Sequence, residues 1–389
     1  MNYNFDKIID RKNTNSLKYD FAVERGKPAN ILPLWVADMD VMAAPEIIAA
    51  ITAGCQHGIF GYSDVKRDYF LTIAKWLDES FNWKVQEDWL IKAPGVVFSI
   101  AMAIRAFTNP GDSILIQRPV YYPFSLTIED NDRRLVNSPL IYKNFHYEMD
   151  YTDFEEKIIQ NNIKLFLLCS PHNPVGRVWT KEELIRIGDI CLKHDVLILA
   201  DEIHHEFVYS GHKHHVFADL KPEYLNRTIT CTAPSKTFNL AGLQVSHIFI
   251  ADQTLRKKFK KEIDKTGYCE LNSLGLIAAK AAYEHGRDWL NQLKVYLAEN
   301  LRLSRDFIEK ELPGVRLVEP EGTYLIWLDF SALGLSPEEL DQKIIHKAGL
   351  WLDRGPMFGP EGANFQRINI ACPRATLTQA LQNLKNILE

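Results

Sequence analysis

The sequence predicts an α/β protein in which a mostly parallel sheet is covered by helices on both faces, followed along the chain by a smaller α+β unit. Two observations support this prediction. Short, almost entirely apolar runs alternate with helical periodicity from about Pro45 to Tyr283, the pattern of parallel strands that are buried on both faces. From Asp288 onward the pattern changes to a long amphipathic stretch followed by mixed strands and helices.

The elements of the larger unit follow in order. Helical spacing of apolar residues begins at Pro45, again near Phe70, and again near Val97. Later, Thr180 and Glu183 have the spacing of a capping box and indicate a helix start. Short buried strands are predicted at Ile114–Ile116, Lys164–Leu168, Val196–Ala200, Thr228–Cys231 and His247–Ile250.

The smaller unit is predicted from its own sequence of elements. These are a helix at Asp288–Glu311, a strand at Gly322–Phe330, a helix after Ser336, a strand at Arg367–Ala371 and a helix from Thr376. We therefore expect an N-terminal segment, residues 1–45, near the active site and the smaller unit. The larger domain would comprise residues 46–287 and the smaller domain residues 288–389.

The composition agrees with this fold class and excludes several functions. Of the 389 residues 46% are hydrophobic, and 45 basic against 50 acidic residues leave a net charge of −5. This balance does not favour a nucleic acid or an anionic membrane as a partner. The sequence contains no apolar run of membrane-spanning length and no apolar signal core, and its six cysteines form no CxxC pair. We expect a cytoplasmic protein with reduced thiols.

Polar clusters directly follow four of the predicted strands. They are Ala93–Val97 after Trp89–Lys92, Ser170–Pro174 after Lys164–Leu168, Asp201–Glu202 after Val196–Ala200, and Ala233–Lys236 after Thr228–Cys231. Because ligands of open α/β sheets bind beyond the carboxyl ends of the strands, these clusters are expected to form one site.

Each cluster also has a simpler explanation. Gly95 could lie in an ordinary turn, Asn173 could cap another, Asp201 could cap a helix, and Lys236 could be a surface lysine. Together, however, they supply a lysine among small apolar neighbours, an acid, an amide, and a helix start that can bind an anion. This is the set of groups that pyridoxal phosphate requires.

Eight segments extend this pattern nearly from end to end of the chain. They are Leu34–Asp40, Phe60–Tyr62, Pro94–Val97, Pro119–Phe124, Cys169–Gly176, Asp201–His204, Ser235–Leu243 and Arg367–Arg374. At these segments the chain resembles the fold-type I pyridoxal-phosphate enzymes, the aspartate aminotransferase superfamily, and within it the MalY/PatB group of cystathionine β-lyases, or C–S lyases. The resemblance implies a large cofactor-binding domain with a seven-stranded sheet between helices, beside the smaller α+β domain.

The resemblance also implies roles toward the cofactor. Lys236 would hold pyridoxal 5'-phosphate as a covalent Schiff base and remove the Cα proton, while Asp201 would pair with the pyridine nitrogen. Tyr121 would stack on the ring and complete the catalytic set with these two residues, and Asn173 would contact the phenolic oxygen. The remaining cofactor contacts would come from Gly95, Val96, Val97, Ser235, His204 and Tyr62.

For the substrate, the resemblance implies that Arg367 clamps the α-carboxylate through two parallel hydrogen bonds. Trp35, Tyr62 and Asn173 would also lie on the substrate side. Tyr62 would reach the phosphate of the neighbouring subunit, which implies a homodimer with active sites at the subunit interface.

Two positions differ from the wider superfamily. Gln244 stands where many aminotransferases have a phosphate-binding arginine, and His204 stands where many have a tyrosine. The histidine run from His204 to His215 lacks the HExxH spacing and an evident third ligand, so no metal site is predicted.

The function implied by the resemblance is α,β-elimination of L-cystathionine or a related cysteine S-conjugate, which yields a thiol such as homocysteine, pyruvate and ammonia. An aminotransferase acting on an L-amino acid is the main alternative, because it shares every step up to Cα-proton removal. A regulatory or interaction protein built on the same fold is the third reading; the complete set of catalytic residues argues against it.

Overall fold

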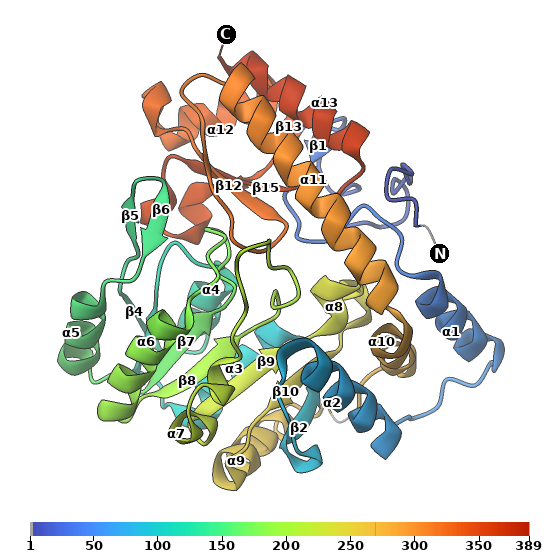
Figure 1. The fold of residues 1–389 in the computed structure, drawn as a ribbon, viewed down its shortest axis with the longest axis vertical. Helices are drawn as coiled ribbons and strands as arrows, with labels where there is room; N and C mark the ends of the chain where they lie inside the picture. Colours follow the sequence, from blue (N-terminus) through green and yellow to red (C-terminus); the bar gives the residue numbers. More distant parts are fainter. Residues whose placement is uncertain (1–2, 269, 389) are drawn as a thin grey trace.

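A seven-stranded sheet forms the centre of the larger unit (Figure 1) in this computed structural model, which describes residues 3–268 and 270–388. The strand order is β2-β10-β9-β8-β7-β3-β4, and all strands run in one direction except β10, which is antiparallel to both of its neighbours. The strands are β2 (Leu90–Ala93), β3 (Ser113–Ile116), β4 (Arg134–Asn137), β7 (Leu165–Cys169), β8 (Leu197–Asp201), β9 (Thr228–Thr232) and β10 (Ser246–Phe249). The predicted mostly parallel sheet is confirmed.

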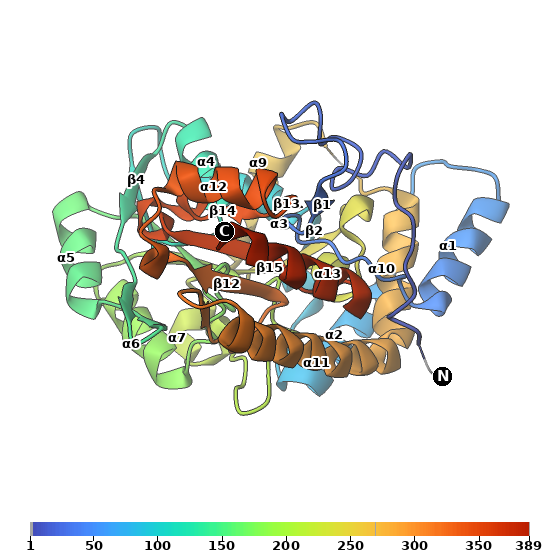
Figure 2. The same ribbon diagram turned by 90° about the horizontal axis from the view of Figure 1, so that it is seen from above.

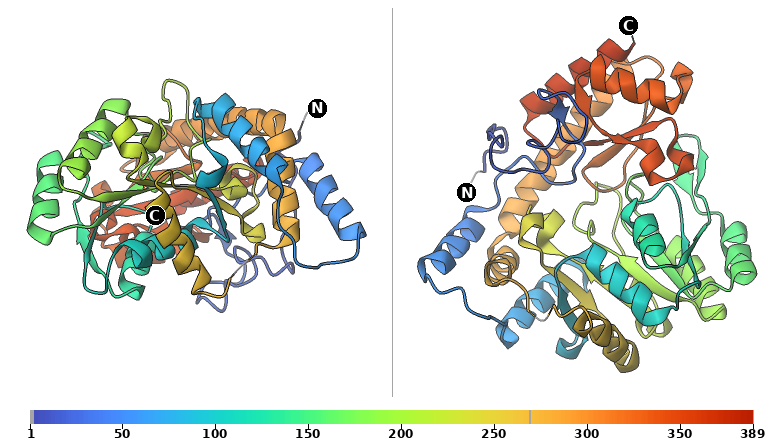
Figure 3. Two further views of the ribbon diagram at one scale, coloured as in Figure 1. Left: turned by 90° about the horizontal axis from the view of Figure 1, so that it is seen from below. Right: turned by 180° about the vertical axis from the view of Figure 1, so that it is seen from behind.

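Helices cover both faces of this sheet, as the front and back views show (Figures 1 and 3). On one face lie α3 (Val96–Phe107), α4 (Pro123–Asp130) and α9 (Gln253–Asp264). On the other lie α5 (Tyr151–Asn161), α6 (Lys181–Lys193) and α7 (Pro222–Leu225). The helices α1 (Pro45–Gln56), α2 (Arg67–Phe81) and α10 (Ser273–His285) pack together beside β2 and β10. Burial on both faces explains why strands such as β7 contain only apolar residues.

The start of several helices follows from capping. Thr180 and Glu183 form the predicted capping box at α6, because the Thr180 side chain accepts from the Glu183 backbone and the Glu183 side chain accepts from the Thr180 backbone. Asp150, Asp252 and Asn272 cap α5, α9 and α10 through their side chains. These caps determine the residue at which each of these helices begins.

The smaller unit is a four-stranded antiparallel sheet covered by helices (Figure 2). Its strands in spatial order are β11 (Arg316–Val318), β12 (Leu325–Asp329), β15 (Phe365–Asn369) and β14 (Asp353–Arg354). Its helices are α11 (Arg287–Glu311), α12 (Pro337–His346) and α13 (Arg374–Leu384). A capping box at Ser336 and Glu339 starts α12, as the predicted helix after Ser336 requires. The last helix begins two residues earlier than predicted.

The N-terminal segment runs alongside the smaller unit. Its short strand β1 (Leu32–Pro33) pairs in parallel with β13 (Leu350–Trp351). A separate hairpin, β5 (Ile141–Lys143) and β6 (His146–Glu148), lies near α5. The domain limits at residues 45 and 287 remain predictions; the second coincides with the start of α11. Among the described residues, no helix is long and apolar enough to span a membrane.

Candidate active site

A pocket opens at the edge of the sheet where β7, β8 and β9 end. It brings together nine of the residues singled out from the sequence: Gly95, Val96, Val97, Tyr121, Asn173, Asp201, His204, Ser235 and Lys236. The clusters after four separate strands therefore do meet at one place. The pocket wall also includes Ala37 of the N-terminal segment, and Gln244.

Lys236 lies in the short helix α8 (Pro234–Thr237), just after β9. Its Nζ donates a hydrogen bond to the Ala37 carbonyl oxygen at 2.9 Å. Burial lowers the pKa of Lys236 to about 8, the Asp38 charge opposes this change, and the Arg367 charge adds to it. At pH 7 about a tenth of the amine is therefore unprotonated, far more than for an ordinary lysine, and this neutral form is the one that acts as a nucleophile or base.

Asp201 is the last residue of β8 and is buried. Among the described residues its carboxylate accepts one hydrogen bond, from the Ile203 backbone N–H at 3.2 Å. Burial raises the pKa of Asp201 to about 7, because one amide donor and the more distant Lys236 charge do not compensate for the loss of water. Such a carboxylate is suited to pair with a cation that enters the pocket.

The N-terminus of α3 offers a place for an anion. Gly95 precedes the helix, and no side chain caps the first backbone N–H groups there. A Cβ atom built on Gly95 would meet nothing within 4 Å, so the space in front of these N–H groups is open. Free N–H groups and the helix dipole together favour a phosphate group at this position. Ser235 lines the same pocket and adds a hydroxyl donor.

Arg367, in β15 of the smaller unit, reaches the pocket through Asn173. One Nη donates to the Asn173 Oδ1 atom at 2.9 Å, and the other donates to the Trp35 carbonyl oxygen at 2.9 Å and pairs with Asp353. The guanidinium also lies over the Phe358 ring, 4.9 Å from its centroid. The Arg367 Nε is buried and has no hydrogen-bond partner among the residues that the structure describes, so this donor is unsatisfied in the protein alone.

Two predicted site residues lie elsewhere in this single chain. The Trp35 indole stacks on Trp351, with the ring centroids 4.5 Å apart, and packs within the smaller unit rather than on the pocket wall. Trp35 approaches the site only by its carbonyl oxygen. Tyr62 is 99% exposed and does not line the pocket.

Three contributors were not identified from the sequence. Asp353 is buried against Arg367 and neutralises the charge of that arginine. In the sequence, the only indication of Asp353 was its position in a pair of polar residues before a glycine. The Ala37 oxygen acts through the backbone, which no residue type indicates. Tyr324 donates its hydroxyl to the same oxygen at 3.0 Å. His204 faces Tyr324 edge-on; burial lowers the His204 pKa to about 3, so this imidazole is neutral.

The histidine run does have an acidic partner, contrary to the sequence reading. Glu202, His205 and His214 each place one potential ligand atom within 4.8 Å of the others, because the loop after β8 folds back on itself. The Glu202 carboxylate already accepts from His214 Nε2 at 3.0 Å and from the Phe217 backbone N–H at 2.9 Å. The cluster thus fastens this loop, and the prediction of no metal site stays a prediction.

Comparisons with known proteins agree with this geometry. The family model for aminotransferase class I and II matches residues 29–384, so the chain belongs to this family. The chain is 41% identical to the cystathionine β-lyase PatB of Bacillus subtilis. The match covers 99% of this chain and 100% of PatB. The chain superimposes on pyridoxal-phosphate-containing cystalysin from Treponema denticola with a TM-score of 0.96 at 38% identity, covering 100% and 99% of the two chains. It also superimposes on a pyridoxal-phosphate-bound structure from Clostridium difficile 630, which is named as a putative aminotransferase. The TM-score is 0.97 at 43% identity, covering 100% of both chains.

The pH dependence of stability follows from Asp201. Its pKa of about 7 in the folded protein exceeds the ordinary value of about 4, so the folded state holds this proton more tightly than the unfolded state. The contribution of neutral Asp201 to stability is therefore fully present at low pH and is lost as the pH rises from about 4 through about 7.

We expect cofactor-free Asp201→Asn protein to be more stable than cofactor-free wild type at pH 8, by up to about 4 kcal/mol, and the difference to shrink toward pH 4. Urea unfolding at the two pH values measures it. Asp78→Asn, at an exposed position, serves as the control and should change little. If Asp201→Asn is less stable than wild type at pH 8, the Asp201 carboxylate is not a buried charge with too few partners, and the account of its raised pKa is wrong.

Proposed function

We propose that this protein is a pyridoxal-phosphate-dependent carbon–sulfur β-lyase that acts on L-cystathionine or a related cysteine S-conjugate. The observation that carries the proposal is the partly buried Lys236 and the buried Asp201 beside an uncapped helix start in one pocket. Full-length similarity to PatB and to cystalysin supports the lyase reaction in particular.

The pocket residues fit the cofactor. The α3 N-terminus and Ser235 would hold its phosphate, Asp201 would pair with the pyridine nitrogen, and Lys236 would carry it covalently. When bound, pyridoxal phosphate supplies an electron sink that stabilises negative charge at the substrate Cα atom. A cationic ring nitrogen next to Asp201 would provide the partner that the buried carboxylate lacks in the protein alone.

Lys236 is the group that moves the Cα proton. Its lowered pKa leaves part of the amine unprotonated, and its hydrogen bond to the Ala37 oxygen holds the nitrogen at the pocket wall. Once the proton has left Cα, the bond between the β-carbon and sulfur breaks with its electron pair going to sulfur. The departing thiolate takes a proton to give the thiol, and water converts the remaining three-carbon fragment to pyruvate and ammonia.

Arg367 orients the substrate by its α-carboxylate. Asn173, Asp353 and the Trp35 oxygen fix the guanidinium plane, which reduces the motion that binding would otherwise have to restrict. Among the described residues the Nε donates to no acceptor, so it would be free to bind the carboxylate. Tyr121 and neutral His204 line the pocket and limit its water, which strengthens these charge-assisted contacts.

An aminotransferase is the second candidate, favoured by the provisional name of the Clostridium difficile structure. Every residue discussed above would serve it equally, because the two reactions share substrate binding and Cα-proton removal. They differ in whether a leaving group departs from the β-carbon.

A homodimer completes the proposal. The segment between α1 and α2 exposes Ile59, Phe60 and Tyr62 within four residues, with 74%, 65% and 99% of these residues accessible, respectively. This segment projects at the edge of the molecule (Figure 2). Three adjacent exposed apolar side chains favour a buried position in an assembly. In a dimer with twofold symmetry, Tyr62 of each subunit would reach the site of the other.

Pyruvate release tests the lyase. With L-cystathionine and no added keto acid, the cofactor-loaded protein should release pyruvate continuously, with one homocysteine and one ammonia each. Lys236→Ala should abolish release by removing the base, and Lys257→Ala, on an exposed face of α9, should leave it unchanged. The contrary result is formation of only one equivalent of keto acid per site, with further formation only after another keto acid is added. This result would contradict the lyase and identify an aminotransferase.

Mixed dimers test the shared site. Tyr62→Ala and Lys236→Ala proteins, each inactive or impaired, should regain about a quarter of wild-type activity after subunit exchange, because hybrid dimers contain one intact site. Lys236→Ala mixed with Asp201→Ala should regain none, since both residues belong to one subunit's pocket. Absence of recovery in the first mixture would place Tyr62 outside the partner's site.

A further inference from the structure

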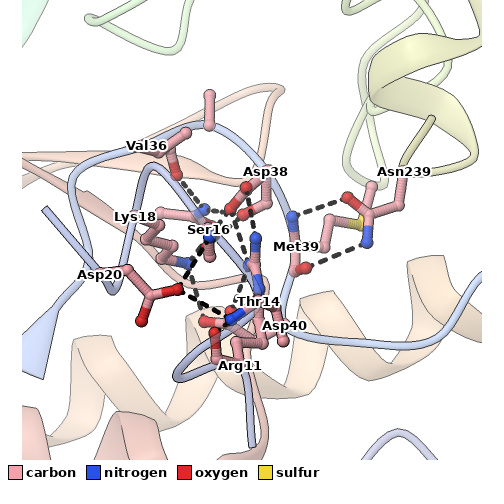
Figure 4. Close-up of polar contacts among 12 residues, drawn as sticks. Arg11, Thr14, Ser16, Lys18, Asp20, Val36, Asp38, Met39, Asp40 and Asn239 are labelled. Carbon is pink, nitrogen blue, oxygen red and sulfur yellow. Dashed lines mark hydrogen bonds and ion pairs between the residues drawn. The ribbon is translucent and has the colours of Figure 1, made fainter. Parts of the chain in front are cut away.

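Residues 36–41, which we call the strap, contribute Ala37 to the pocket wall and make hydrogen bonds to both the larger and the smaller unit, some of which Figure 4 shows. On the smaller-unit side, the Asn369 side chain donates to the Val36 oxygen at 2.7 Å and to the Asp38 oxygen at 2.6 Å. The Asp40 backbone N–H donates to the Ala371 oxygen at 2.9 Å. The strap has no regular secondary structure, so these contacts determine its path.

On the larger-unit side the strap is held by Asn239, three residues after Lys236. The Asn239 Oδ1 accepts from the Met39 backbone N–H at 2.9 Å, and Nδ2 donates to the Met39 oxygen at 3.0 Å and to the Val41 oxygen at 2.9 Å. Figure 4 shows this side chain facing Met39. Both donors and the acceptor of the amide are thereby used. Asn239 has a positive φ of 59°, a conformation that Asn tolerates better than most residues.

The strap in turn supplies the partner of the catalytic amine. The Ala37 oxygen accepts from Lys236 Nζ at 2.9 Å and from the Tyr324 hydroxyl at 3.0 Å. Ala37 lies two residues before Met39, so the place of its carbonyl depends on how the Met39 backbone is held. The Lys236 turn therefore contacts the strap twice, through its own amine and through Asn239.

A cluster of ion pairs secures the outer side of the strap. Arg11 binds both carboxylate oxygens of Asp38, at 3.0 and 2.8 Å, and also Asp40 at 2.7 Å. The fully buried Lys18 donates to Asp40 at 2.7 Å. Burial alone would raise the pKa of Asp38, but the Arg11 hydrogen bonds and the Lys18 charge outweigh it and lower the pKa. Asp38 thus stays ionised, and its charge acts on Lys236.

We propose that Asn239 is a positioning residue for Lys236: by holding the strap at Met39 and Val41, it keeps the Ala37 carbonyl where it orients the lysine amine for transfer of the Cα proton. This inference rests on the proposed function only in taking Lys236 as the Cα base, a step that a lyase and an aminotransferase share. A purely structural role for the Asn239 turn would predict a loss of stability without a specific loss of proton transfer.

Asn239→Gly removes all three hydrogen bonds and keeps a residue that accepts positive φ. Asn144→Gly is the matched control, because Asn144 also has positive φ, at 52°, and lies exposed in the β5–β6 turn. The readout is replacement of the Cα hydrogen of L-alanine by solvent deuterium, followed by NMR with the cofactor-loaded proteins. Alanine has no β leaving group, so this assay reports proton transfer apart from elimination.

For Asn239→Gly we expect the maximal exchange rate to fall about tenfold or more with KM for alanine little changed, and Asn144→Gly to stay within about twofold of wild type. Amide hydrogen exchange of the strap supplies a readout without turnover: the Met39 N–H should exchange faster in Asn239→Gly and not in Asn144→Gly. Asn239→Asp keeps the hydrogen-bond acceptor and loses both donors, so its exchange of the Cα hydrogen should be slowed as well. This variant replaces Asn239→Gly in the test if the glycine variant does not fold.

A faster-exchanging Met39 N–H with an unchanged rate of Cα-hydrogen exchange would overturn the proposal, since the strap would then be loose without consequence for Lys236. An unchanged Met39 N–H would overturn it too. The two proposals can fail separately. If the wild type exchanges the alanine Cα hydrogen but releases no pyruvate from L-cystathionine, the proposed lyase activity is wrong. The comparison of Asn239→Gly with Asn144→Gly then still tests the role of Asn239.

Discussion

The site depends on one constraint: an amine and a carboxylate share a pocket with few partners for either. Within residues 3–268 and 270–388, Lys236 has one carbonyl acceptor and Asp201 has one amide donor, and their pKa values move toward each other, to about 8 and about 7. Leaving such groups poorly solvated is costly unless a ligand completes their interactions. Under the proposed function, binding of the cofactor would relieve this cost, because it would supply a covalent partner for the amine and a cation for the carboxylate.

The two units have different tasks around that pair. The parallel sheet brings the ends of β7, β8 and β9 to one edge and aims α3 at the same place, which accounts for the cofactor side of the pocket. The smaller unit contributes Arg367, which contacts Asn173, and the N-terminal segment contributes the Ala37 oxygen, which contacts Lys236; in the proposed function Arg367 would bind the substrate. The second group is held by long-range hydrogen bonds rather than by one element, so its geometry depends on how the units pack.

Residue types and the order of strands along the chain were sufficient to predict a mostly parallel sheet and seven of the pocket residues, because side chains after parallel strands share one edge. Tyr121 and His204 were predicted only through the family resemblance. Contributions that act through the backbone were not predictable in this way. The Ala37 oxygen carries no residue signal, and the Trp35 indole packs on Trp351 while the Trp35 oxygen accepts from Arg367. Glu202, His205 and His214 meet only because a loop folds back, which spacing along the chain does not reveal.

The most direct test of this account is to locate the covalent link to the cofactor. The protein is loaded with pyridoxal phosphate, reduced with borohydride and digested, and its peptides are mapped by mass. The account predicts the phosphopyridoxyl group on the peptide that contains Lys236, and loss of that label in Lys236→Ala. A label on any other lysine, or none on a protein that binds the cofactor, would contradict the assignment of the buried amine as the centre of the site.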